Sequence, residues 1–217
     1  MNLVFRDIIP YIPEMLKGLS LSIFVTIIAM ALGLLLGIFA AVLRSRDNFI
    51  LRSAGKTYIE IFRNTPLLVQ LYLIYFGLGQ LGIDINPLWS AVIGLTINNG
   101  AYTAEILRAG FSGVSKNLKE AGLALGLNRF QLFRLVVLPP AIKSVFPALT
   151  NQFILLFLFS SVASMISFGE LTHQIMNIQS QTARTFEVIF AGLVLYYGVS
   201  SILSYLSKII ERKAFKW

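Results

Sequence analysis

Residues 19–43 read LSLSIFVTIIAMALGLLLGIFAAVL, and no charged side chain interrupts them. The hydrocarbon core of a bilayer is about 30 Å thick and is crossed by a helix of about 20 mainly apolar residues. The run is continuously apolar, whereas a transmembrane β-strand alternates between apolar and polar positions. It is also too long for the apolar part of a signal peptide, so we expect it to remain in the mature protein as a transmembrane helix.

The composition of the whole chain agrees with a membrane location. Of its 217 residues, 56% are hydrophobic and only 13% are charged, whereas roughly a quarter of the residues of a soluble domain are charged. The chain contains no cysteine, which excludes disulfides, cysteine-ligated metal centres and thiol catalysis. We therefore predict an integral membrane protein.

Further apolar runs define the expected organisation. Each is long enough to cross a bilayer as a helix, and no internal repeat is evident. The prediction is an all-α integral membrane protein with five transmembrane helices in one domain, residues 1–217. The expected spans are about 19–43, 58–81, 88–109, 142–168 and 186–210, and the longest connection is about 110–141.

The distribution of Lys and Arg predicts the orientation. Cytoplasmic connections carry more of these residues than external ones. Fifteen of the 18 lie in or beside the 44–57 connection, the 108–143 region and the C-terminal tail, and only Arg6, Lys17 and Arg184 lie on the other side. The N-terminus is therefore expected outside, with the longest connection in the cytoplasm. The net charge of +8 reflects this topology, and we expect no nucleic-acid partner.

The sequence offers no enzyme site. The segment SAGKT at 53–57 ends like a phosphate-binding loop, but Ile50 stands where that pattern begins with glycine. If ATP is used, another chain binds it. The lone His173 has no second imidazole with which to bind a metal, so a surface position is expected. No nucleophile and base can be paired, and no cofactor is expected.

Polar residues within the apolar runs are the candidate solute site. An unpaired amide at membrane depth is costly, and a proline frees a backbone carbonyl, which is tolerated where it lines a cavity or packs in protein. Hydrogen bonding between helices is the alternative explanation for each residue taken singly. The candidate pocket residues are Thr65, Pro66, Leu67, Asn98, Asn99, Ser160, Ser161, Ser164 and Glu170.

Charged residues at the inner boundary suggest a second feature. Glu60, Arg63, Glu105 and Arg108 lie near the cytoplasmic ends of the second and third spans. We expect ion pairs that close the cytoplasmic side, although long side chains can equally extend to the interface.

The segment 120–140, EAGLALGLNRFQLFRLVVLPP, interrupts the apolar pattern. A short amphipathic helix is expected from about Asn117 to Leu125, ended by Gly126 in a left-handed conformation. Asn128 and Gln131 have the spacing of a capping box, which predicts a second helix ending at Pro139–Pro140. A helix this short is unstable alone in water, so packing in a partner's groove or on the bilayer must support it.

The same segment resembles the EAA signature of the membrane subunits of bacterial ABC importers. The matching residues are Glu120-Ala121, Gly126 and Leu138-Pro139, with Gly122 and Val136 as mild departures. FRNTPLLVQLYLIYFGL at 62–78 and AYTAEILRAGFSGV at 101–114 are similar to the polar amino-acid branch of these permeases, the histidine, glutamine and arginine type. The resemblance extends from about residue 15 to the C-terminus.

The resemblance implies a function and partners. The 117–127 helix would be a cytoplasmic coupling helix that docks on a separate ATP-binding cassette subunit, which binds ATP and magnesium. A second permease chain, identical or related, and an extracytoplasmic solute-binding protein would complete an importer in the bacterial plasma membrane. The residues implied in coupling are Glu120, Ala121, Gly122, Leu125 and Gly126.

The expected substrate is a polar amino acid. Asn98, Ser161 and backbone groups near Pro66 could receive its carboxylate, and Glu170 could attract a cationic side chain. Basic amino acids are thus favoured, with a neutral amide such as glutamine left open. Two alternatives remain: a self-sufficient secondary transporter or channel, which would typically have more spans or a repeat, and a membrane scaffold that does not transport.

Overall fold

The computed structural model describes residues 3–215, and every regular element within them is helical. This confirms the all-helical class. The elements are η1 (Phe5–Tyr11), α1 (Ile12–Arg44), α2 (Phe49–Arg63), α3 (Leu67–Tyr72), η2 (Leu73–Gly77), α4 (Leu78–Gln80), α5 (Pro87–Ser112), α6 (Lys116–Ala124), α7 (Arg129–Gln131), η3 (Leu132–Val137), α8 (Leu138–Phe159), η4 (Ser160–Ile166), α9 (Leu171–Thr182) and α10 (Thr185–Ala214).

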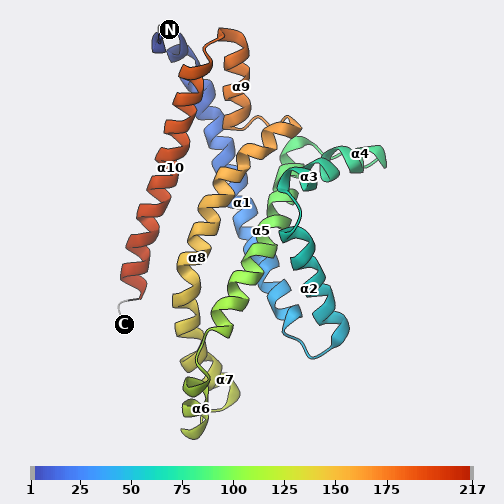
Figure 1. Ribbon diagram of the computed structural model, residues 1–217, viewed down its shortest axis with the longest axis vertical. Helices are drawn as coiled ribbons and strands as arrows, with labels where there is room; N and C mark the ends of the chain where they lie inside the picture. The colour runs from blue at the N-terminus through green and yellow to red at the C-terminus, as the bar shows by residue number, and fades with distance from the viewer. Residues whose placement is uncertain (1–2, 216–217) are drawn as a thin grey trace.

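The long helices α1, α5, α8 and α10 run along the molecule, with α6 and α7 at one extremity, towards which α10 runs without reaching it, and α9 and η1 at the other (Figure 1). We call these extremities the α6 end and the α9 end. The contact between α1 and α5 is more extensive than that between any other two described elements. Their backbones approach closely at Gly33 and Gly37, where an added Cβ would lie 2.6 Å from side-chain atoms of Asn99 and Thr103. Such small residues permit close contact of membrane helices.

Within residues 3–215, three helical stretches are long and apolar enough to cross a membrane: Phe5–Arg44, Arg129–Ile166 and Thr185–Ala214. The expected spans 19–43 and 186–210 lie within the first and third of these, and 88–109 lies within α5. The second expected span, 58–81, is not one helix. Helix α2 begins already at Phe49, and the chain breaks after Arg63 before α3 begins at Leu67, because Pro66 cannot donate a helical hydrogen bond.

The prediction that a helix ends at Pro139–Pro140 is wrong. Helix α7 continues through the π-helical segment η3 into α8, which includes both prolines in its first turn. In η3 the N–H of Leu138 bonds to the carbonyl of Phe133, five residues earlier. A wider turn of this kind accommodates a local irregularity within a continuous helix. The stretch Arg129–Ile166 is therefore one helical column from the α6 end towards the α9 end.

Candidate functional site

A cavity of about 460 Å³ lies beside the break between α2 and α3. Residues 63–68 form its wall on that side, Asn98 and Tyr102 of α5 form another, and Phe159 and Val162 from the end of the α8 column complete it. The cavity thus brings together four of the predicted pocket residues: Thr65, Pro66, Leu67 and Asn98.

The break itself is held by a hydrogen-bonded network around the carbonyl of Phe62. In a continuous helix this carbonyl would receive the N–H of residue 66, which is proline and has none. The Nε2 of Gln70 donates to it at 3.0 Å, and the Nδ2 of Asn98 at 3.3 Å. Asn98 also donates to the Oε1 of Gln70 at 3.2 Å. Two buried amides therefore replace the missing backbone donor.

Gln70 also ties the break to Thr65. Its Nε2 donates to the carbonyl of Thr65 at 3.1 Å and to its hydroxyl at 2.8 Å. The sequence interpretation missed Gln70, although a lone amide four residues after a proline in an apolar run was a usable signal. Both hydrogen bonds that Asn98 makes use its Nδ2. Asn98 also lines the cavity, and its Oδ1 accepts no hydrogen bond from the described residues.

Arg63 and Tyr102 add a charge and a ring to the cavity. The guanidinium carbon of Arg63 lies 5.5 Å from the centre of the Tyr102 ring, a distance at which a cation is attracted to the ring. The Tyr102 hydroxyl donates to the Arg63 carbonyl at 3.4 Å. Tyr102 was not among the predicted site residues. Nothing in its sequence spacing separates it from the many other aromatic residues that are exposed on the helices.

The remaining predicted pocket residues do not line this cavity. Asn99 is fully buried between α1 and α8, where its Oδ1 accepts from Gln152 at 3.4 Å and its Nδ2 has no partner among the described residues. Ser160, Ser161 and Ser164 each donate to a carbonyl three residues earlier, at 2.7 Å. These hydroxyls therefore bond to backbone carbonyls at the end of α8 and in η4, and Val162 is the residue of η4 that lines the cavity.

Glu170 lies at the α9 end, away from the cavity. It caps α9 by accepting from the N–H of His173 at 2.8 Å, and it also accepts from the hydroxyls of Ser22 at 3.2 Å and Tyr196 at 2.7 Å. Its side chain is completely buried, and this burial raises the pKa of Glu170, opposed in part by these hydrogen bonds. The carboxyl joins α1, α9 and α10.

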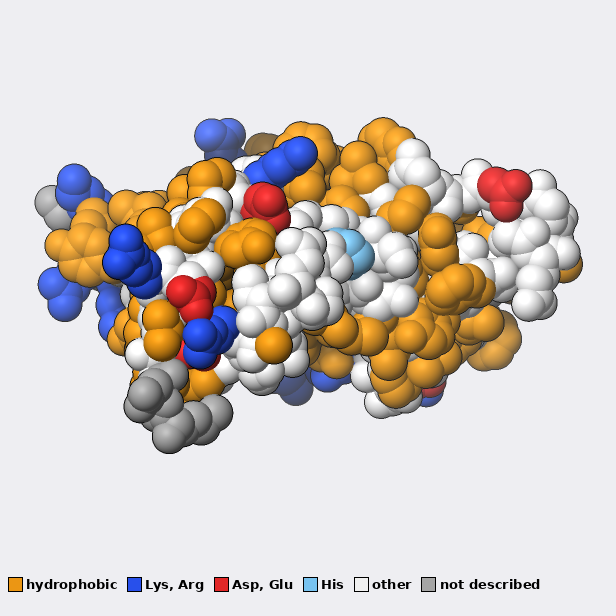
Figure 2. Space-filling model, turned by 90° about the horizontal axis from the view of Figure 1, so that it is seen from above, with side chains coloured by type: hydrophobic (Ala, Val, Ile, Leu, Met, Phe, Trp, Pro, Cys, Tyr) orange, Lys and Arg blue, Asp and Glu red, His pale blue; other side chains and the backbone are white. Residues whose placement is uncertain are grey.

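The surface around α9 is polar but carries few charges. Seen from the α9 end, much of the surface next to the pale blue histidine is white, the colour of the backbone and of side chains that are neither hydrophobic nor charged, and a few charged side chains lie to one side (Figure 2). The pale blue residue is His173, the only histidine of the chain, and it is partly exposed. No group of three potential metal ligands occurs among residues 3–215.

The charged residues near the α6 end form a cluster on Glu105. Its carboxylate lies 2.7 Å from Arg44 of α1, 2.5 Å from Arg108 and 3.8 Å from Arg63 of α2. The predicted ion pairs of Arg63, Glu105 and Arg108 are thus present, while Glu60 pairs instead with Lys56 on its own helix at 3.6 Å. The cluster ties α1, α2 and α5 together directly beside the cavity.

The short helix expected in the 110–141 connection is present as α6. Gly126 follows it with a φ of +79°, and the capping box between Asn128 and Gln131 is formed in both directions. Glu120, Ala121, Leu125 and Gly126 are exposed, with Leu125 at 81%.

Gly122 differs from the other residues of α6 implied in coupling because it is buried. A Cβ at this position would lie 2.5 Å from the Leu132 side chain of η3. This glycine therefore permits close packing within the chain. Through it, α6 rests on the helical column Arg129–Ile166, whose other end reaches the cavity at Phe159 and Val162.

Comparison with known proteins defines the class. Residues 33–216 match the family described as "Binding-protein-dependent transport system inner membrane component", and the chain belongs to this family. It is 36% identical over 215 residues to the arginine transport system permease protein ArtQ of Bacillus subtilis (strain 168), with 98% of each chain covered. It is 35% identical over 206 residues to the glutamine transport system permease protein GlnP of Escherichia coli (strain K12), with 94% of each covered.

Solved structures agree with this assignment. An amino acid ABC transporter crystallised with histidines has a TM-score of 0.93 at 38% identity, covering 98% of this chain and 100% of that one. A chain of the MetNI methionine ABC transporter in an inward facing conformation has a TM-score of 0.78 at 23% identity and shares the fold.

Family membership settles the general role. The chain is a permease subunit of a bacterial ABC importer and a multi-pass component of the inner membrane. It is not an enzyme and needs no cofactor of its own, because ATP is bound by a partner subunit. An ATPase and a solute-binding protein are therefore among its partners.

Proposed function

We propose that this permease carries a polar amino acid through the cavity between α2, α3 and α5, and that α6 transmits the work of the ATPase to it. The observation that carries the proposal is the helical column Arg129–Ile166. It contacts α6 at one end and forms the cavity wall at the other. Relatives named for arginine and glutamine transport support the substrate class.

The cavity suits the two charges that every free amino acid carries. Arg63 can bind the α-carboxylate, because a guanidinium matches a carboxylate in two parallel hydrogen bonds. The Oδ1 of Asn98 and the Thr65 hydroxyl can accept from the ammonium group. Arg63 is 37% exposed at its side chain, so it reaches the cavity without leaving the vicinity of Glu105.

The residues that line the cavity also indicate which charge the side chain of the substrate carries. No carboxylate lines the cavity among the described residues, and Glu170, which favoured basic amino acids in the sequence, is bound elsewhere. We infer a preference for a neutral polar side chain such as that of glutamine, because a cationic one would meet Arg63, and the nearest carboxylate, that of Glu105, is already shared by three arginines.

The coupling residues divide into two groups. Glu120, Ala121, Leu125 and Gly126 are exposed and available to the ATPase, whereas Gly122 holds α6 against η3. When the ATPases close, α6 moves with them and pushes the column. The cluster on Glu105, which ties α1, α2 and α5 together, closes the side of the cavity nearest α6.

The complete importer follows from the same features. We propose five membrane crossings, with the N-terminus and α9 outside and α6 in the cytoplasm, as the basic residues indicate. Two permease chains, identical or closely related, pair with two ATPases. The surface of α9, a helix with no Asp, Glu, Lys or Arg, receives the solute-binding protein.

The test is ATP hydrolysis by the reconstituted complex of permease, ATPase and binding protein, titrated with glutamine, histidine and arginine. The Arg63→Gln variant removes the carboxylate ligand, and we expect the concentration for half-maximal stimulation to rise about 10- to 100-fold, as for loss of a charged hydrogen bond. Arg52→Gln, on an exposed part of the same helix, is the matched control. An unchanged titration for Arg63→Gln would exclude the cavity as the substrate site.

A further inference from the structure

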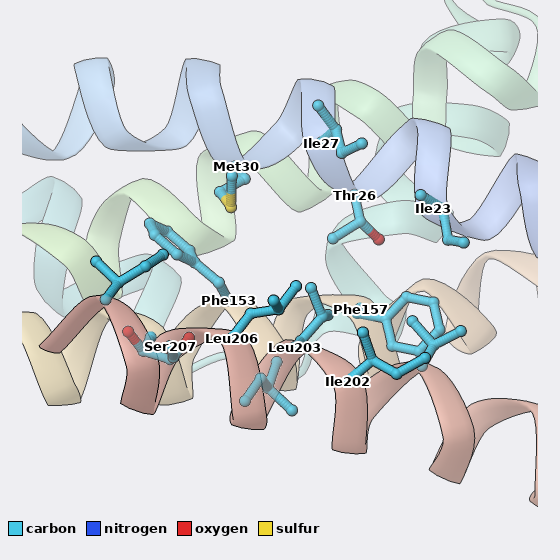
Figure 3. Close-up of a pocket in the computed structure, with 14 residues that line it drawn as sticks. Ile23, Thr26, Ile27, Met30, Phe153, Phe157, Ile202, Leu203, Leu206 and Ser207 are labelled. Carbon is cyan, nitrogen blue, oxygen red and sulfur yellow. The ribbon is translucent and has the colours of Figure 1, made fainter. Parts of the chain in front are cut away.

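A second hollow lies between α1, α8 and α10 and is almost entirely apolar. Its volume is about 510 Å³. Side chains of α1 and α10 extend towards each other across it, with Phe153 and Phe157 of α8 between them (Figure 3). Thr26, one of its few polar residues, donates its hydroxyl to a carbonyl of its own helix at 2.7 Å. We call this hollow the α10 groove.

The groove exists because α10 leans on α8 and α9 and makes little contact with α1. Along α10 it runs from Val199 to Ile210, which corresponds to about 16 Å of helix. One leaflet contributes half of the roughly 30 Å hydrocarbon core. The groove therefore matches the depth of a single leaflet.

A basic hollow of about 370 Å³ lies beside the next residues of α10 towards its C-terminal end. Lys143 of α8 and Lys208 and Arg212 of α10 line it, together with Glu211 and Phe215. Lys208 and Arg212 are exposed, and neither takes part in an ion pair within residues 3–215. The rings of Phe146 and Phe215, 5.5 Å apart, bring the two helices together there.

We propose that the α10 groove and the basic hollow together bind one anionic phospholipid of the leaflet at the α6 end. One acyl chain lies in the groove between α1, α8 and α10, and the phosphate lies against Lys208 and Arg212. In the orientation proposed above this is the cytoplasmic leaflet, where basic pockets between membrane helices bind anionic headgroups.

Charge favours a lipid over a second copy of the chain as the occupant. The α6 end carries most of the 18 Lys and Arg of each chain, so a second copy seated at the basic hollow would bring like charge to Lys208 and Arg212. An anionic headgroup neutralises them. An acyl chain also has no polar group that the apolar groove would leave without a hydrogen-bond partner.

The test uses the complete transporter, reconstituted in bilayers of equal parts phosphatidylglycerol and phosphatidylcholine, extracted in detergent and weighed by native mass spectrometry. The wild type is expected to retain phosphatidylglycerol in preference to phosphatidylcholine. Each basic side chain near an anionic surface contributes about fivefold in affinity, so Lys208→Gln/Arg212→Gln is expected to lower this preference about 25-fold. Arg46→Gln/Lys213→Gln removes the same charge outside the hollow and is expected to leave it unchanged.

A second pair of variants tests the acyl chain. Leu203→Trp fills the groove and leaves the basic residues in place, so retained phosphatidylglycerol is expected to fall to the level of phosphatidylcholine. Leu193→Trp, at a position on α10 that is 59% exposed and outside the groove, is expected to behave as wild type.

Three results would overturn the proposal. The first is equal retention of both lipids by the wild type, and the second is equal loss in both charge variants, which would indicate attraction to net charge alone. The third is dissociation of the second permease chain in Leu203→Trp with retention of phosphatidylglycerol unchanged, which would assign the groove to a second copy.

Discussion

Replacing Gln70 with leucine tests whether buried amides hold the break between α2 and α3. Gln70 is 5% exposed and makes four hydrogen bonds. Two of them reach the carbonyl and the hydroxyl of Thr65, which is exposed, so water can replace Gln70 as their donor. The other two join the Phe62 carbonyl and Asn98, and each contributes roughly 1 kcal/mol. We therefore expect the free energy of unfolding to fall by about 2 kcal/mol.

The assay is reversible unfolding of the complex in mixed micelles, followed by near-ultraviolet circular dichroism. Gln80→Leu is the matched control, because Gln80 is exposed at the end of α4, and a surface change of this kind is expected to cost less than about 0.5 kcal/mol. A loss below about 0.5 kcal/mol in Gln70→Leu would refute the reasoning, because the Phe62 carbonyl would then not depend on the side-chain donors.

A double-mutant cycle with Pro66→Ala sharpens the same prediction. Alanine supplies the backbone N–H that residue 66 lacks, so Phe62 no longer needs Gln70 as a donor. Gln70→Leu should then cost about 1 kcal/mol less in the Pro66→Ala background than in the wild type. Strictly additive losses would show that the proline and the glutamine act independently.

Three further changes probe the coupling segment, the charge cluster and the α9 end. Gly126→Val places a β-branched side chain at a φ of +79°. It should destabilise the folded complex by about 1–2 kcal/mol, measured as a lower melting temperature, whereas Gly126→Asn should lower the melting temperature much less. Glu105→Gln leaves Arg44, Arg63 and Arg108 without their shared carboxylate and should raise ATP hydrolysis in the absence of substrate, measured as basal turnover. Because burial raises the pKa of Glu170, the folded state keeps this proton to a higher pH than the unfolded state does. The protonated carboxyl of Glu170 therefore stabilises the fold fully below the pKa of the unfolded state, and this stabilisation is lost as pH rises through the pKa of the folded state. Glu170→Gln should flatten the resulting fall in melting temperature between acidic and neutral pH.

Local sequence signals predicted the α6 region well. Gly126 adopts the left-handed conformation that a helix end requires, and Asn128 and Gln131 form their capping box. Both features depend only on residues within one or two turns. The helix end expected at Pro139–Pro140 failed because proline is tolerated in a first helical turn, and the π-helical segment η3 leads directly into such a turn.

The candidate site was only partly predictable. Pro66 marks a break in the helix, and the amide of Asn98 at membrane depth marks a partner for it. The position of Glu170 could not be predicted, because its partners Ser22 and Tyr196 lie 148 and 26 residues away in the chain. The start of the second span was misplaced, because α2 begins already at Phe49, among the charged residues of the preceding connection.

The most direct test of the coupling between α6 and the cavity is amino-acid uptake and ATP hydrolysis measured in the same proteoliposomes. Ala121→Arg places a charge on the exposed surface of α6 and leaves the cavity intact. Our account predicts that binding protein loaded with substrate no longer stimulates hydrolysis in this variant, and that uptake falls to background, while the subunits still co-purify. Uptake and stimulated hydrolysis at wild-type rates in Ala121→Arg, or uptake by the permease chain without any ATPase, would contradict it.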